Sequence, residues 1–203
     1  MLFFKKAIAC GLALLAVPSF AGITPAQMVN NLDTLRAKSF AIQADAKSIT
    51  ILNGPLIAIG LGPFPKIITG FTDIVTTATA AIAQMQGSAI ITNPADAKAV
   101  ADAFRLFVKV HQDLLNILIG KAGLFTIVPI IGTPVAAVLR SIEAVVDTAA
   151  FGIINTVEVA ASKALIQSDA DSLHATIGVS INAYVGLIPL TKRHARDFTP
   201  IRV

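Results

Sequence analysis

The stretch from Leu114 to Leu139 contains one charged residue, Lys121, in twenty-six positions. Connections between secondary-structure elements normally run over the surface and are polar. This stretch must therefore be covered by other elements, insert into a partner, or lie in a membrane. Residues 122–139 reach the lower length limit of a spanning helix, but they contain Pro129, and Thr133-Pro134 is a helix start signal. We therefore expect no transmembrane span.

Most of the remaining chain carries apolar residues spaced three and four apart, which is typical of helices that bury one face. Three segments begin with a polar N-cap residue followed by proline, at Thr24-Pro25, Asn93-Pro94 and Thr133-Pro134. Turn-forming residues such as Asn53 and Gly87 end the pattern. No segment shows the sustained alternation of a strand. The sequence therefore predicts an all-α protein, with helices at about residues 25–52, 66–86, 94–120, 134–167 and 172–186.

Consecutive helices joined by short links lie side by side in opposite directions, so we expect an antiparallel bundle of about five amphipathic helices. In an up-and-down order the first and third connectors fall at the same end. These connectors, residues 56–65 and 120–133, are apolar, whereas the links at 87–93 and 167–171 are more polar. The bundle should thus have one hydrophobic end. Its two apolar connectors either close over a bound molecule or face outward.

The N-terminal residues have the three parts of a secretory signal peptide. Lys5-Lys6 is positive, residues 7–17 are apolar, and Ser19-Phe20-Ala21 places small residues before a cleavage site. We expect residues 1–21 to be removed on secretion. The only cysteine, Cys10, is then lost as well, so the mature chain must be held by its core.

The mature chain is long enough for one domain, over residues 22–190, followed by a flexible basic tail at 191–203. The domain holds ten basic and eleven acidic residues, a net charge of about −1. Nucleic-acid binding requires basic residues clustered on one face. We therefore expect no nucleic-acid partner.

His111 is the most unusual polar residue, because it falls between Phe107 and Leu114 on an apolar helix stripe. Such a histidine is most often a core residue whose ring bonds a neighbouring hydroxyl or backbone group. Alternatively His111, or Arg105 or Lys109 one turn away, meets the polar head of a bound amphiphile. A catalytic role is the third and least favoured interpretation.

Other chemical signals are weak. His174 and His194 lack metal-ligand spacing to His111. The chain has no Gly-x-Ser-x-Gly elbow, and Gly60-Leu61-Gly62 lacks the rest of a dinucleotide fingerprint. We therefore predict a protein that is not an enzyme and uses no metal or cofactor.

The chain is very apolar, with a mean hydropathy of +0.75. A protein of this kind that does not span a membrane must bury its apolar residues, place some against a ligand, or adsorb to a surface. Our leading hypothesis is a bundle that binds a fatty acid or another lipid in its interior. The residues expected to contact the ligand are Leu35, Ile42, Phe71, Ile74, Phe104, Phe107, His111, Leu114, Leu124, Phe125, Ile142, Val146, Ile177 and Ile181.

Three segments beyond the signal peptide resemble a fungal family, the hydrophobic surface-binding protein A group and its relatives, the cell-wall galactomannoproteins. They are Leu32-x-x-Leu35, the segment Lys121-Ala-Gly-Leu124-Phe125, and Ser172-Leu173 through Ile181-Asn182-Ala183-Tyr184. The resemblance implies a secreted, cysteine-poor helical protein. Some family members bind fatty acids inside the bundle and others adsorb to hydrophobic surfaces. Many wall-bound relatives end in a Ser/Thr-rich stalk and an anchor signal, whereas residues 191–203 have neither.

Two alternatives to interior lipid binding stay open. The first is an adsorption protein that coats hydrophobic surfaces and recruits secreted hydrolases through its apolar end. The second is a structural mannoprotein of the cell wall. A homodimer would be a further way to cover the apolar end.

Overall fold

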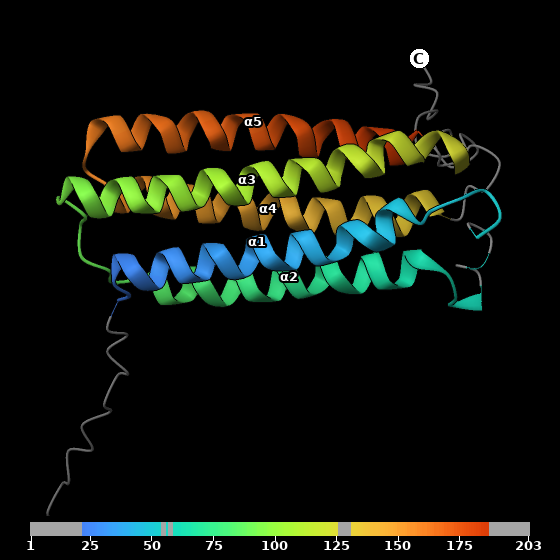
Figure 1. Cartoon of the computed structure of the whole chain (residues 1–203), viewed down its shortest axis with the longest axis horizontal. Helices are drawn as coiled ribbons and strands as arrows, with labels where there is room; N and C mark the ends of the chain where they lie inside the picture. The colour runs from blue at the N-terminus through green and yellow to red at the C-terminus, as the bar shows by residue number, and fades with distance from the viewer. Residues whose placement is uncertain (1–21, 54–55, 57–58, 126–130, 187–203) are drawn as a thin grey trace, which may run out of the picture.

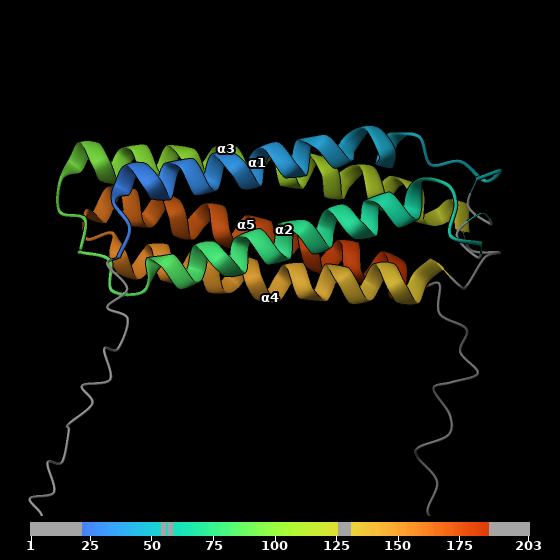
Figure 2. The same ribbon diagram turned by 90° about the horizontal axis from the view of Figure 1, so that it is seen from below.

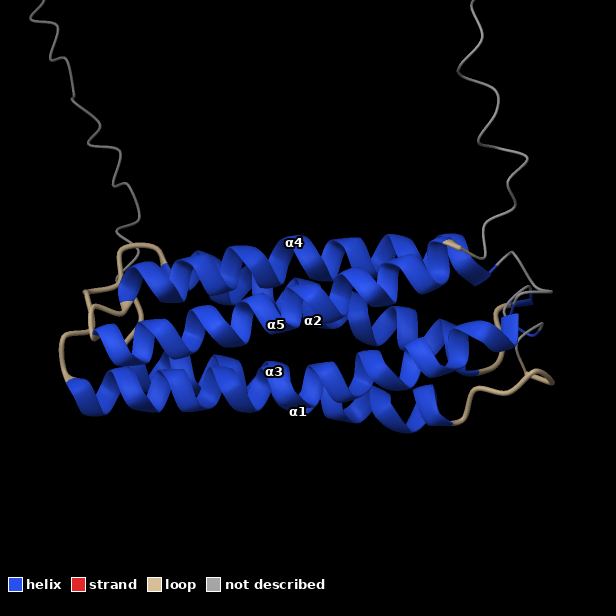
Figure 3. Cartoon of the chain, turned by 90° about the horizontal axis from the view of Figure 1, so that it is seen from above, coloured by secondary structure: helices blue, strands red, loops and turns tan. Residues whose placement is uncertain are grey.

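The computed structural model describes residues 22–53, 56, 59–125 and 131–186. The expected signal peptide and basic tail lie outside this part. The described elements are helices joined by loops, as the sequence predicted (Figure 3). They are α1 (Pro25–Lys47), α2 (Pro63–Met85), α3 (Pro94–Ala122), the short 3-10 helix η2 (Gly123–Phe125), α4 (Gly132–Thr156) and α5 (Ala160–Val185).

The predicted helix starts at Thr24 and Asn93 are confirmed by their capping hydrogen bonds. The Gln27 N–H donates to Thr24 Oγ1 (3.3 Å), and the Thr24 N–H donates to Gln27 Oε1 (2.8 Å). These reciprocal bonds satisfy backbone donors that a helix terminus otherwise leaves unpaired. At the start of α3, the Ala95 N–H donates to Asn93 Oδ1 (2.8 Å).

The five long helices form a closed ring in the order α1–α3–α5–α4–α2 (Figures 1 and 2). Successive helices along the chain run in opposite directions, as predicted. However, α3 does not lie mainly against α2 and α4, its neighbours in sequence. It packs between α1 and α5, which run parallel to it. The sequence prediction that every consecutive pair lies side by side is therefore wrong for α3.

The ring has two different ends. The α1–α2 and α3–α4 connections lie at one end, on the right in Figure 1, which we call the connector end. The other end, which we call the bridged end, holds the α2–α3 and α4–α5 links. There the Ile91 N–H donates to the Thr156 carbonyl (2.8 Å) and the Glu158 N–H donates to the Ile91 carbonyl (3.1 Å). This pairing forms an isolated parallel bridge between Ile91 and Val157.

Four predicted helix boundaries are wrong. Two of the differences are small: α2 begins at Pro63 rather than near residue 66, and α4 begins at Gly132, with Ile131 at its N-cap and no capping hydrogen bond from Thr133. The other two are larger. First, α1 ends at Lys47 rather than near residue 52, because Asn53 closes a turn after it. The Thr50 N–H donates to Asn53 Oδ1 (2.8 Å), and Asn53 Nδ2 donates to the Ser48 carbonyl (2.8 Å).

Second, the break before the last helix lies at residues 157–159, not at 168–171. The bridge to Ile91 draws Val157 out of the helical path. Residues 168–171 lie inside α5, where Asp169 forms an ion pair with Arg105 of α3 (3.0 Å). These polar residues therefore mark an outward-facing part of a helix and not a turn.

Candidate functional site

The predicted ligand-contacting residues gather inside the ring. All five long helices contribute, and the residues with described side chains are buried, except for the half-buried Leu124. Leu124 packs against the same apolar core. The side chain of Phe125 lies outside the described part of the chain. The structure thus brings these residues into one core, and their contact with a ligand stays a prediction.

His111 of α3 is fully buried, at 0% exposure. Its Nδ1 lies 2.8 Å from Ser39 Oγ of α1, and the same hydroxyl donates to the Leu35 carbonyl at 2.9 Å. The favoured interpretation of His111 as a core histidine that bonds a neighbouring hydroxyl is therefore correct for one of its two ring nitrogens. Arg105 and Lys109 are exposed and do not share this interior position.

The surroundings of the imidazole keep it uncharged. Phe71 of α2 meets the ring edge-on, with centroids 6.0 Å apart, and Phe107 lies tilted at 5.4 Å. Burial lowers the pKa of His111 to about 4 because the charged form loses its hydration. At neutral pH the ring is a neutral hydrogen-bonding group in an apolar setting.

Two buried polar atoms have no hydrogen-bond partner in the described structure: His111 Nε2 and Ser180 Oγ of α5. Most buried polar groups are paired, so each such atom calls for an explanation. Other polar groups in the core do find partners. The Tyr184 hydroxyl donates to the Leu118 carbonyl (3.0 Å), and Gln43 Nε2 donates to the Val110 carbonyl (3.2 Å).

The sequence contained a signal for the two serines that the site prediction omitted. Ser39 stands on the apolar stripe of α1, four residues after Leu35. Ser180 follows Leu173 by seven residues and so lies on the same helix face. A small polar residue on an apolar stripe is the pattern that would have identified both.

The interior also holds a narrow apolar crevice of about 20 Å³ between α1, α2 and α4. Ala78, Ala81 and Met85 of α2 line it opposite Ala149 and Ile153 of α4. This volume admits about one water molecule, far less than an acyl chain. A lipid can therefore enter only if the helices move apart here. Small alanine side chains interlock little, which makes this seam a favourable place for such movement.

A larger groove of about 510 Å³ runs outside the ring between α1 and α2, near the connector end. Ile42 and Gly70 lie in it, where a Cβ on Gly70 would be 2.7 Å from Ile42 Cγ1. The groove is open and is flanked by the ion pairs Lys66–Asp45 (3.8 Å) and Lys38–Asp73. Glycine at position 70 thus permits the close approach of these two helices.

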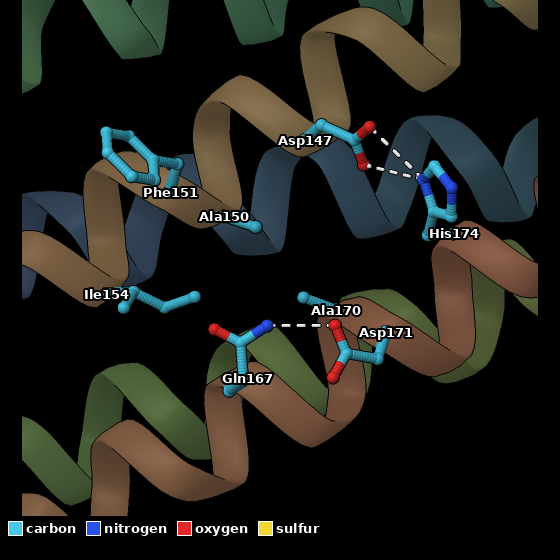
Figure 4. Close-up of a pocket in the computed structure, with 8 residues that line it drawn as sticks. All are labelled: Asp147, Ala150, Phe151, Ile154, Gln167, Ala170, Asp171 and His174. Atoms are coloured by element: carbon cyan, nitrogen blue, oxygen red, sulfur yellow. Dashed lines mark hydrogen bonds and ion pairs between the residues drawn. The ribbon is translucent and has the colours of Figure 1, made fainter.

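A third pocket, of about 250 Å³, lies between α4 and α5 (Figure 4). His174 Nδ1 is 3.2 Å from both carboxylate oxygens of Asp147, and Gln167 Nε2 donates to Asp171 Oδ1 (2.8 Å). These groups pair with one another at the surface. No group of three or more potential metal ligands forms among the residues that the structure describes.

The connector end presents aliphatic side chains to solvent. Leu52 is 89% exposed, Ile59 69% and Leu61 57%. These three side chains of the α1–α2 connection therefore face outward. Over the described residues, no helix is long and apolar enough to cross a membrane.

No family model matches this sequence, and no curated protein matches it. Solved structures do share its fold. AfMP4p in complex with palmitic acid has a TM-score of 0.60 at 15% identity, covering 79% of this chain and 99% of that one. Ligand binding domain 1 of Penicillium marneffei MP1 protein, complexed with arachidonic acids, also has a TM-score of 0.60 at 15% identity. That match covers 77% of this chain and 98% of the domain.

Ligand binding domain 2 of the same Penicillium marneffei protein, complexed with multiple arachidonic acids, has a TM-score of 0.52 at 12% identity. That match covers 79% of this chain and 94% of the domain. These neighbours confirm the helical fold. The narrower resemblance to the hydrophobic surface-binding protein A family stays a prediction.

Proposed function

We propose that this protein is a secreted, non-enzymatic binder of fatty acids or similar single-chain amphiphiles. The ligand lies in the apolar interior of the five-helix ring. The observation that carries the proposal is this interior, in which apolar side chains surround a buried His111 nitrogen that has no partner. The fold is also that of proteins whose structures hold palmitic acid and arachidonic acids.

The energetics favour a long acyl chain. Each buried CH₂ group contributes about 0.8 kcal/mol, so a long chain supplies enough free energy to separate packed helices. The polar contacts between helices favour separation of α2 from α4, because side-chain bonds join α2 to α1 and α4 to α5. Gln112 Nε2 joins α3 to Ser172 and Thr176 of α5 at 2.9–3.1 Å. By contrast, α2 and α4 face each other across the alanine-lined crevice.

The test is the lipid content of the protein recovered from its own host. Native mass spectrometry followed by lipid extraction should identify a bound amphiphile, and a fluorescent fatty acid should be displaced at micromolar protein. Ala81→Leu, which fills the crevice, should weaken displacement several-fold. Ala83→Leu, the same change at an exposed position of α2, should have no effect. Absence of both bound lipid and displacement would refute the proposal.

Secretion has its own test. The protein collected from the culture medium should begin at Gly22, as N-terminal sequencing would show. An intact chain that begins at Met1 and stays inside the cell would contradict secretion without bearing on lipid binding.

A second function, adsorption to hydrophobic surfaces, is favoured by the exposed aliphatic side chains of the connector end. Leu52→Asp with Leu61→Asp should reduce adsorption to polystyrene at least tenfold, because each leucine loses about 2 kcal/mol of apolar transfer free energy. Ile90→Asp is the matched control, since Ile90 is 54% exposed at the opposite end. Equal adsorption by the double variant and the wild type would exclude this function.

A further inference from the structure

The two short contacts of Ser39 favour one position for the proton of His111. Ser39 has one hydroxyl proton, but its Oγ makes two short contacts, to the Leu35 carbonyl and to His111 Nδ1. A carbonyl only accepts, so the hydroxyl proton lies in the contact with Leu35. The proton in the other contact must then come from the ring. The tautomer with its proton on Nδ1, donated to Ser39 Oγ, makes both contacts hydrogen bonds, whereas the other tautomer leaves the Leu35 contact as two facing acceptors.

The opposite nitrogen, Nε2, is consequently a bare acceptor. It is buried, has no hydrogen-bond partner among the residues that the structure describes, and belongs to a ring that packs against Phe71 and Phe107 in the apolar interior. Leaving a buried acceptor unpaired is unfavourable. A ligand that supplies a donor at this point would remove that penalty, whereas a ligand that only accepts would add a second lone pair facing the first.

We propose that His111 Nε2 is the head-group site of the interior and selects amphiphiles whose head group donates a hydrogen bond. Long-chain alcohols and un-ionised fatty acids have such a proton. Carboxylates, esters and ethers accept only. This inference rests on the proposed function, and it adds a rule about which amphiphiles bind best.

Ser180 is the natural comparison residue, because within the described part of the chain its Oγ is the second buried side-chain polar atom without a hydrogen-bond partner. On α5 it lies between Thr176, which bonds Gln112 of α3, and Tyr184, which bonds Leu118. Ser180 thus stands further toward the connector end than the level of His111. A hydroxyl both donates and accepts, so Ser180 does not discriminate between the two kinds of head group.

The experiment is a competition between dodecanol and its methyl ether, which have the same alkyl chain and no charge at any pH. The purified protein is incubated with an equimolar mixture, and the bound ratio is measured by lipid extraction and gas chromatography. We expect the ratio of alcohol to ether to fall about fivefold in His111→Phe, the effect of losing one net hydrogen bond. It should be unchanged in Ser180→Ala.

Ser39→Ala provides a second variant with a different expectation. Without the Ser39 hydroxyl the ring is free to move its proton to Nε2 and donate, so the ether should gain relative to the alcohol. This smaller change keeps the test available if His111→Phe does not fold. On adding dodecanol, the ¹⁵N resonance of His111 Nε2 should shift in the wild type, and the ether should leave it in place.

The outcomes separate the two proposals. If neither compound binds, interior lipid binding fails. If both bind and the ratio is the same in the wild type, His111→Phe and Ser39→Ala, lipid binding stands and the head-group assignment to His111 is overturned. A fall in the ratio in Ser180→Ala equal to that in His111→Phe would also overturn it.

Discussion

The two ends of the ring differ in how far their apolar residues are covered. At the bridged end, backbone hydrogen bonds join Ile91 to the α4–α5 link, and both Ile91 (4% exposed) and Val157 (0%) are buried. At the connector end, Ile49 and Phe64 are equally buried, yet Leu52 beside them is 89% exposed. At the bridged end, the two helix links hydrogen-bond to each other. At the connector end, the loop exposes apolar side chains to water.

This difference indicates which end of the ring would gain free energy from contact with an apolar partner. A closed end contributes stability, because its side chains and backbone groups are satisfied within the protein. Exposed aliphatic side chains contribute little to folding and gain free energy only when something covers them. We therefore expect substitutions at the bridged end to change the stability, and substitutions in the exposed part of the connector end to change binding.

The largest expected effect tests this division directly. Ile91→Ala should lower the free energy of unfolding by about 4 kcal/mol, since it leaves a cavity beside Val157. Leu52→Ala should change it by less than about 0.5 kcal/mol. Urea denaturation followed by circular dichroism measures both. Similar losses in the two variants would show that the ends do not differ in stability.

The middle of the ring, between the two ends, should respond to pH through His111. Its pKa in the folded protein is about 4, below the ordinary 6.5, so the unfolded chain takes up the proton first as the pH falls. The contribution of uncharged His111 to the free energy of unfolding is therefore fully present above pH 6.5. It is lost as the pH falls toward 4, which lowers the free energy of unfolding by about 3 kcal/mol. His111→Phe should remove this slope from the denaturation midpoints, whereas His174→Phe at the exposed α5 surface should retain it.

Two glycines, one toward each end of the ring, differ in how closely a neighbouring helix approaches them. Gly70 lies toward the connector end, where an added Cβ would be 2.7 Å from Ile42 Cγ1, so Gly70→Ala should destabilise the protein by about 1–2 kcal/mol. Gly152 lies toward the bridged end, where a Cβ would meet only the flexible Met85 Cε at 3.2 Å. Gly152→Ala should be neutral or stabilise by up to about 1 kcal/mol. Thermal unfolding of both variants measures the difference, and equal shifts would contradict it.

The smallest effect concerns the one charge of the Leu114–Leu139 stretch. Lys121 Nζ donates to the Ile49 carbonyl (3.0 Å), which joins the end of α3 to the loop that follows α1. Lys121→Met should cost about 1 kcal/mol and accelerate amide hydrogen exchange in residues 49–53. Lys109→Met, on the exposed face of the same helix, is the control. Unchanged exchange in Lys121→Met would show that this bond does not hold the connector.

Helix starts could be predicted where their signals are local. Thr24 and Asn93 bond backbone groups within three residues, and there the pattern of cap and proline located the helix start. The same pattern at Thr133-Pro134 did not, because α4 begins at Gly132 without a side-chain cap. The boundary between α4 and α5 could not be found this way, because a bridge to the distant Ile91 interrupts the helix at Val157. The polar residues 168–171 were misread as a turn, since their surface pairing with α3 is not visible in one segment.

In the candidate site, too, burial could be predicted from local spacing, whereas hydrogen-bond partners could not. Burial of Phe71, Phe104 and Ile177 followed from their spacing on helix stripes. The partner of His111 did not, because Ser39 stands 72 residues away. Which ring nitrogen is bonded, and which is left without a partner, depends on the packing of α1 beside α3.

The sequence by itself determined an all-α chain with buried stripes and an apolar connector between the first two helices. Those features depend on interactions between residues three or four positions apart, which the order of the amino acids records directly. Only the tertiary structure decided that α3 lies between α1 and α5, that Leu52 faces solvent, and that His111 Nε2 is buried without a hydrogen-bond partner among the described residues. These features depend on contacts between helices. An apolar stripe shows that a helix face is buried, but it does not show which helix packs against that face.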